Sequence, residues 1–91
     1  MSNNLAGGWT GFNFELTAEA KKVFAEAVTL AGTKYTPFAF ATQVVAGTNY
    51  SFLSQAQYVV PNTVRVVKLH IYQPLPGQGQ PHIAQIIEIT P

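Results

Sequence analysis

The chain of 91 residues contains no cysteine and no aspartate. Without cysteine it cannot form a disulfide bond, a thiolate zinc site or a nucleophilic thiol. The acidic side chains are four glutamates, of which Glu19 and Glu26 are expected two turns apart on a helix surface. The two histidines, His70 and His82, fall on separate predicted strands with no acid placed to complete a triad or a metal shell. We therefore expect no enzymatic activity, no catalytic residue, no metal site and no cofactor.

Charge is also scarce, because charged residues make up 10% of the chain and the formal net charge is +1. The five cationic residues are scattered, whereas binding to nucleic acid needs a basic stripe. No apolar run approaches the roughly 20 residues of a membrane span, and the first residues lack a signal-peptide pattern. The composition predicts a soluble protein that binds neither nucleic acid nor a membrane. A cytoplasmic protein and a mature secreted form both fit it.

Hydrophobic residues reach 47% of the chain, which suits one packed core in a domain of this size. We expect a single domain over residues 1–91. Thr17 is a candidate helix N-cap, because its hydroxyl can accept from a first-turn amide, and Gly32 is placed to end the helix. Between them apolar residues recur at helical spacing, which predicts a core-facing stripe of Ala20, Val23, Phe24, Ala27, Val28 and Ala31.

Alternation of apolar and polar residues predicts five strands. The first lies before the helix and carries Phe12, Phe14 and Leu16, and the other four lie at residues 38–45, 50–58, 64–72 and 82–89. Short turns between the later strands make the sheet antiparallel, and one helix can cover only one of its faces. The expected fold is α+β, with one long helix packed on a five-stranded antiparallel sheet. The second face is then wet or bound by a partner.

Glycine is grouped with apolar residues in three segments: Leu5-Ala6-Gly7-Gly8-Trp9, Gln43-Val44-Val45-Ala46-Gly47 and Pro74-Leu75-Pro76-Gly77-Gln78. Each segment falls where a predicted strand begins, ends or turns. Alternate turns of an antiparallel meander emerge at the same end of the sheet. The three segments are therefore expected to form an apolar wedge at one edge, and an exposed apolar wedge usually marks a binding site.

The same segments carry a family resemblance. Gln43-Val44-Val45-Ala46-Gly47-Thr48-Asn49-Tyr50 resembles the QxVxG first hairpin loop of the cystatins, in the form found in the stefins. Leu5-Ala6-Gly7-Gly8 resembles their amino-terminal trunk, with Gly7 at the family's glycine. Leu75-Pro76-Gly77-Gln78 resembles the second hairpin loop of stefins, where Leu-Pro takes the place of Pro-Trp. The resemblance covers the chain from Leu5 to Ile89 and implies a cystatin-like fold.

By this resemblance the protein is a reversible, tight-binding, competitive inhibitor of papain-like cysteine proteases such as papain and the cathepsins. Residues 1–6 would be a flexible trunk along the non-primed subsites, and the two loops would block the primed side beside the catalytic thiolate. The implied protease-binding residues are Leu5, Ala6, Gly7, Gly8, Gln43, Val44, Val45, Ala46, Gly47, Leu75, Pro76, Gly77 and Gln78.

Some features depart from the family pattern or leave alternatives open. Ala6 is smaller than the residue that many cystatins offer to the second subsite, and Trp9 has no family counterpart. Trp9 could be core, added contact area or a lid. The active form is expected to be a monomer, although straightening the loop at Gly47 would allow a domain-swapped dimer. The alternative function is a cystatin-fold protein-binding module without inhibitory activity, because a fold alone does not fix function.

Overall fold

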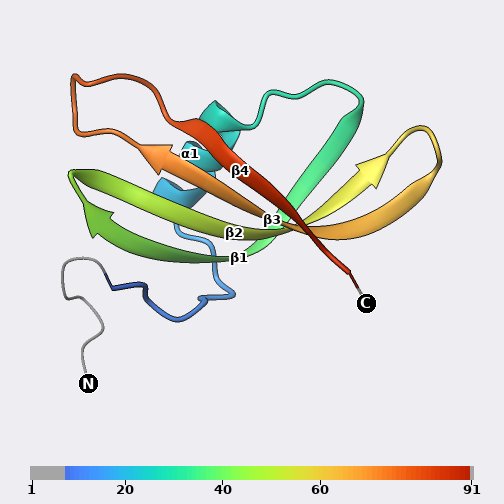
Figure 1. The fold of residues 1–91 in the computed structure, drawn as a ribbon, viewed down its shortest axis with the longest axis horizontal. Coiled ribbons are helices and arrows are strands. Elements are labelled where there is room, and N and C mark those ends of the chain that lie inside the picture. Colours follow the sequence, from blue (N-terminus) through green and yellow to red (C-terminus); the bar gives the residue numbers. More distant parts are fainter. Residues whose placement is uncertain (1–7, 91) are drawn as a thin grey trace.

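The computed structural model describes residues 8–90, which form one helix packed on one face of a four-stranded antiparallel sheet (Figure 1). The strands are neighbours in the order β1-β2-β3-β4, so each pairs with the next along the chain. The predicted α+β class and antiparallel meander are confirmed. The elements are α1 (Ala18–Ala27), β1 (Thr33–Val45), β2 (Gly47–Tyr58), β3 (Thr63–Gln73) and β4 (His82–Ile89).

Thr17 caps α1, as the sequence predicts. Its Oγ1 accepts a hydrogen bond of 3.1 Å from the amide of Ala20, one of the first-turn donors that have no partner within the helix. The predicted apolar stripe faces the sheet, and Ala20, Val23 and Phe24 are buried. The N-cap sets where the helix begins, and the stripe sets which side it turns to the core.

The helix ends earlier than the pattern predicts. Its last residue is Ala27 rather than Ala31, and Val28 already has extended backbone angles, although its amide still donates to the helix. Val28 and Thr29 are β-branched and lose side-chain freedom in a helix, which weakens its continuation. Gly32 therefore does not cap the helix, and its φ of 85° serves the bend before β1. No helix within residues 8–90 is long and apolar enough to cross a membrane.

The core lies between α1 and the two central strands. Phe24 of the helix meets Phe52 of β2 edge to face, with ring centroids 5.0 Å apart. The apolar side chains of β3, Val67, Leu69 and Ile71, are buried against the helix side of the sheet. The other members of this cluster are Ala20, Val23, Tyr50 and Ala56.

The predicted first strand is wrong. Residues 12–16 form no strand, and the backbone of residues 8–17 pairs with β1 only through isolated bridges at Trp9 and Asn13. The Asn13 side chain accepts from the amide of Glu15 in a turn that ends this pairing, although the Phe14 ring still stacks on Phe38 of β1. Phe14 is left 68% exposed. The apolar residues alternate here, but the segment forms no ladder with β1. The sheet of the described chain therefore has four strands and not five.

The second predicted strand is longer than expected, because β1 begins at Thr33 and not at residue 38. Pro37 lies inside it, beside a register shift between Pro37 and Ala39. Proline donates no ladder hydrogen bond and is tolerated on an edge strand or at a bulge. β1 is an edge strand of the sheet, so it can include Pro37 and extend on both sides of it.

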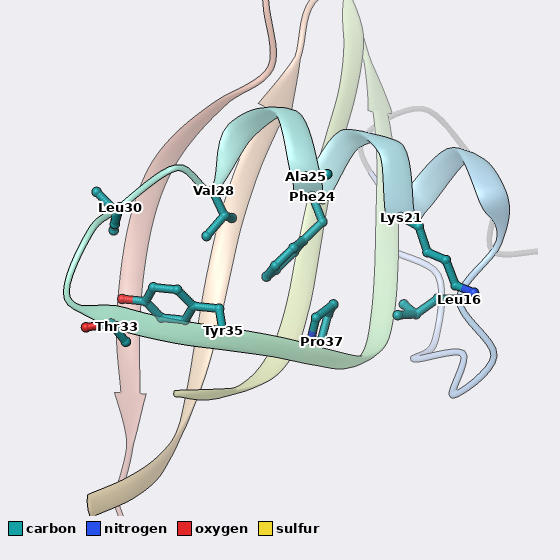
Figure 2. Close-up of a pocket in the computed structure, with 9 residues that line it drawn as sticks. All are labelled: Leu16, Lys21, Phe24, Ala25, Val28, Leu30, Thr33, Tyr35 and Pro37. Atoms are coloured by element: carbon teal, nitrogen blue, oxygen red, sulfur yellow. The ribbon is translucent and has the colours of Figure 1, made fainter. Parts of the chain in front are cut away.

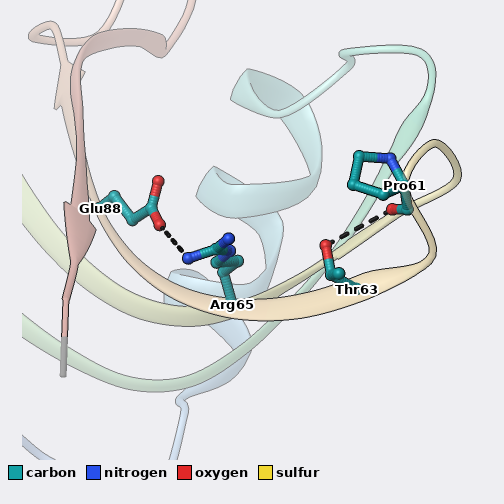
Figure 3. A network of polar contacts seen from close by, with 4 residues as sticks. All are labelled: Pro61, Thr63, Arg65 and Glu88. Carbon is teal, nitrogen blue, oxygen red and sulfur yellow. Dashed lines mark hydrogen bonds and ion pairs between the residues drawn. The ribbon is translucent and has the colours of Figure 1, made fainter.

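At the far end of the sheet, β3 and β4 are joined by an ion pair between Arg65 and Glu88 at 3.0 Å (Figure 3). Both side chains are exposed, so the pair contributes about 0–1 kcal/mol to folding stability. Nearby, the Thr63 hydroxyl donates to the carbonyl of Pro61 in the β2–β3 turn. This end of the molecule is opposite the two loops that the sequence places at the binding edge (Figure 1).

Candidate functional site

Two loops lie at the same end of the sheet, as the meander predicts (Figure 1). One is the β1–β2 turn, and the other is the β3–β4 connection over residues 74–81. The Tyr72 hydroxyl donates a hydrogen bond to the Ala46 carbonyl, which ties the first turn to the strand that leads into the second loop. We call residues 43–47 together with residues 75–78 the loop edge.

The first turn requires glycine at position 47. Gly47 has a φ of 111°, a region that residues with side chains rarely adopt. A Cβ there would run into the Gln73 carbonyl oxygen and would lie 3.0 Å from the Tyr72 hydroxyl. The turn is therefore pressed against β3, and only a residue without a side chain fits.

Gln43 holds the strands together just before this turn. It lies opposite Asn49 in the β1–β2 ladder, and the Asn49 Nδ2 donates to the Gln43 Oε1 at 2.8 Å. The Gln43 side chain thus bridges β1 and β2 beside the turn. Such a cross-strand bond keeps the register that places the turn at Ala46 and Gly47.

The loop edge is apolar and carries no charged side chain. Its large apolar side chains are exposed to solvent: Val44 by 55%, Val45 by 41% and Leu75 by 50%. The second loop closes on itself through a hydrogen bond of 2.9 Å from the amide of Gln78 to the carbonyl of Leu75. A depression of about 310 Å³ separates the two loops, and its walls are Ala46, Tyr72, Pro74, Leu75, Gln78 and His82.

Trp9 attaches the chain that precedes α1 to the sheet beside the loop edge. Its backbone bridges to Gln43, and the next residue, Thr10, donates its amide to the Thr42 carbonyl at 2.9 Å. The Thr42 amide in turn donates to the Thr10 hydroxyl at 3.0 Å. Gly8 therefore lies next to the first turn. Leu5, Ala6 and Gly7, the other predicted trunk residues, lie outside the described residues.

The Trp9 indole packs on His70, with ring centroids 5.7 Å apart and a tilt of 34° between the planes. His70 points to the face of the sheet opposite α1, so the N-terminal segment covers part of the face that was expected to be open. Ala41 and Ser51 on that face are buried. Burial, with a smaller effect of the Lys68 charge, lowers the pKa of His70. Trp9 does not belong to the core cluster and is 37% exposed, so the core alternative is wrong, whereas its roles as added contact area or as a lid stay predictions.

The structure thus brings together all the predicted loop residues, with Gly8 beside them. Sequence reasoning missed Tyr72 and the partner of Trp9. The alternation over residues 64–72 predicted the strand, but it carried no signal for what the Tyr72 and His70 side chains touch across the sheet.

The edge exposes apolar side chains and no ionisable group. No group of three or more acidic, histidine or cysteine side chains in the described chain is close enough to hold a metal. No protein-family model, curated protein sequence or solved structure matches this chain. The structure defines an α+β domain whose sheet carries two apolar loops at one end.

Proposed function

We propose that the protein is a reversible, competitive inhibitor of papain-like cysteine proteases, which inserts the loop edge into the enzyme's active-site cleft. The observation that carries this proposal is the position of the two loops. The turn at residues 45–47 and the loop at residues 75–78 lie at one end of the sheet and are linked through Tyr72 and Ala46. These are also the segments that resemble the two hairpin loops of the stefins.

The exposed side chains of the edge suit a cleft that excludes water. Val45 and Leu75 would each bury apolar surface, worth roughly 1.5–3 kcal/mol for a side chain buried completely. Gly47 and Gly77 allow the backbone to approach an enzyme closely. Because the hydrogen bonds of Gln43 and Tyr72 already hold the first turn, little conformational entropy is lost when it binds.

The turn also suits an inhibitor rather than a substrate. Ala46 is the only residue between β1 and β2, and the ladder pairs Val45 with Gly47 directly across it. Cleavage would require this backbone to open into an extended segment, and opening would break the neighbouring ladder bonds. In the proposed complex the enzyme therefore does not cleave the turn. Residues 5–7 would add contacts on the non-primed side.

The test is a titration of papain and a cathepsin with the full chain, followed by progress curves for recovery of activity. We expect inhibition at an equimolar ratio with a dissociation constant on the order of nanomolar, or about −12 kcal/mol. No inhibition at micromolar protein would refute the proposal, as would cleaved protein released in step with enzyme recovery. Absence of inhibition with retained fold would favour the non-inhibitory binding module.

Matched substitutions separate the loop edge from general surface effects. Val45→Ser and Leu75→Ser should each weaken inhibition about tenfold or more, because each removes an apolar side chain from the proposed contact. Val59→Ser and Val60→Ser change valines that are 69% and 88% exposed at the opposite end of the sheet. These two should leave inhibition unchanged. Equal effects at both ends would place the contact elsewhere.

A further inference from the structure

A groove separates α1 from the first half of β1 (Figure 2). It exists because the helix stops at Ala27 and the chain runs on in extended form before β1 returns beneath it. Its volume is about 560 Å³, within the roughly 300–1,000 Å³ typical of small-molecule sites. The walls are formed by Leu16, Lys21, Phe24, Ala25, Val28, Leu30, Thr33, Tyr35 and Pro37.

The groove is apolar and reaches the core. Phe24 is 7% exposed and belongs to the core cluster, and Leu16, Val28 and Tyr35 are partly buried against that cluster. Leu30 closes one end and is 49% exposed. The Phe24 and Tyr35 rings and the Pro37 ring lie along the middle of the groove in Figure 2, so an apolar chain laid there would contact both walls.

The polar groups of the groove lie toward its ends. Among the residues 8–90 that line the groove, Lys21 is the only charged one. It extends beside Leu16 at one end, while the hydroxyls of Tyr35 and Thr33 lie at the other (Figure 2). Within residues 8–90 the one salt bridge is that of Arg65 with Glu88, so Lys21 has no acidic partner there. Burial raises the pKa of Tyr35, with a smaller contribution from Tyr58, so its hydroxyl stays neutral.

We propose that this groove binds a monocarboxylate with an unbranched apolar tail, of the kind found in medium-chain fatty acids. The tail lies along Phe24, Val28 and Tyr35, and the carboxylate meets the Lys21 ammonium. A single lysine matches the single charge of a carboxylate, whereas a phosphate dianion would call for further cationic donors. The site shares no residue with the loop edge, so this proposal stands independently of the inhibitory function.

The test uses decanoate and decanol, kept below their aggregation concentrations, as ligands of the ¹⁵N-labelled full chain. We expect decanoate to shift the amide resonances of Leu16, Val28, Leu30 and Tyr35, with a dissociation constant on the order of 100 µM. The Gln43 and Gly77 amides serve as internal controls and should not shift. Shifts confined to the loop edge, or no shifts at millimolar decanoate, would overturn the proposal.

Two variants test the parts of the site. Lys21→Gln should weaken decanoate binding by roughly two- to fivefold, the value of one surface charge pair, and should leave decanol binding unchanged. Lys22→Gln is the matched control, because Lys22 is exposed on the same helix and does not line the groove. Ala25→Phe fills the groove from an exposed helix position and should abolish binding of both ligands. Equal weakening by the two lysine variants, or undiminished binding to Ala25→Phe, would refute the proposed site.

Discussion

The hydroxyl of Tyr72 donates a hydrogen bond to the backbone carbonyl of Ala46, 26 residues earlier in the chain. Tyr72 stands in β3 near the start of the second loop, and Ala46 is the single residue of the β1–β2 turn. The Tyr72 ring also meets His82, the first residue of β4, edge to face at 5.7 Å between centroids. One side chain therefore contacts the first turn and the strand that follows the second loop, and its removal should disturb the two loops together.

Tyr72→Phe tests this link, because it removes the hydroxyl and keeps the ring. We expect the free energy of unfolding to fall by about 0.5–1.5 kcal/mol, the net value of one hydrogen bond. Papain should dissociate from the variant several times faster, since the first turn is held less firmly. Urea denaturation and dissociation kinetics measure the two effects. A loss of stability with an unchanged dissociation rate would show that the bond supports the fold alone.

Gly47→Ala and Gly77→Ala separate crowding from backbone strain. Both glycines have positive φ, of 111° and 80°, but only at Gly47 would a Cβ meet other atoms. Strain alone should cost about 1–3 kcal/mol at either position. Gly47→Ala should cost more than Gly77→Ala, because the added methyl group meets the Gln73 carbonyl oxygen. Urea denaturation of the two variants measures the difference. Equal losses in the free energy of unfolding would mean that β3 moves aside freely.

The pKa of the His70 imidazole should lie below its ordinary value of about 6.5, because Trp9 and the sheet partly bury the ring. Between the folded pKa and pH 6.5 the His70 side chain is then protonated in the unfolded chain but largely neutral in the folded chain. Folding stability should therefore fall as pH drops through about 6.5 toward the folded pKa, and level off beneath it. Trp9→Ala should expose the ring and raise its pKa toward the ordinary value. NMR titration of the His70 ring measures both, and a pKa unaffected by Trp9→Ala would contradict the burial argument.

The trunk prediction concerns residues that precede the described chain. Leu5 can bury a full aliphatic side chain in a protease subsite, worth roughly 1.5–3 kcal/mol, whereas Ala6 offers about one methyl group, near 0.8 kcal/mol. Deleting residues 1–6 should speed dissociation from papain, and Leu5→Ala should account for most of that change. Ala6→Val should slow dissociation from enzymes with a roomy second subsite.

Dissociation rates of these three variants decide the prediction. An unchanged rate after truncation would mean that inhibition rests on the two loops alone. Faster dissociation of Ala6→Val would show that Ala6 does not face that subsite. Gly11→Ala is a suitable control, because a Cβ at Gly11 would meet no atom within 4 Å.

The elements after the helix were predictable because their signals are local. Alternation identified the four later strands, and the short turns between them gave the meander order, which placed both loops at one end of the sheet. The constraint at position 47 is only partly local. It combines the positive φ of the turn with the nearby Gln73 carbonyl oxygen, which comes from a segment distant in sequence.

The segment before the helix shows the limit of such signals. Phe12, Phe14 and Leu16 alternate as a strand would, yet the chain turns at Asn13, and residues 12–16 share one isolated backbone bridge with β1 in place of a ladder. A strand exists only if a neighbour offers a continuous ladder, and β1 is interrupted beside Pro37. Whether a segment pairs with an edge strand depends on both segments, so it cannot be predicted from the residue pattern of one of them.

The sequence by itself determined the N-cap at Thr17, the apolar face of the helix, the alternation of the later strands and the residues of the two loops. These follow from propensities and spacings within a few residues of each other. Tertiary structure decided the bond between Tyr72 and Ala46, the packing of Trp9 on His70 and the groove beneath the helix. Each of these depends on the twist of the sheet and on where α1 stops, which place side chains together across long stretches of chain.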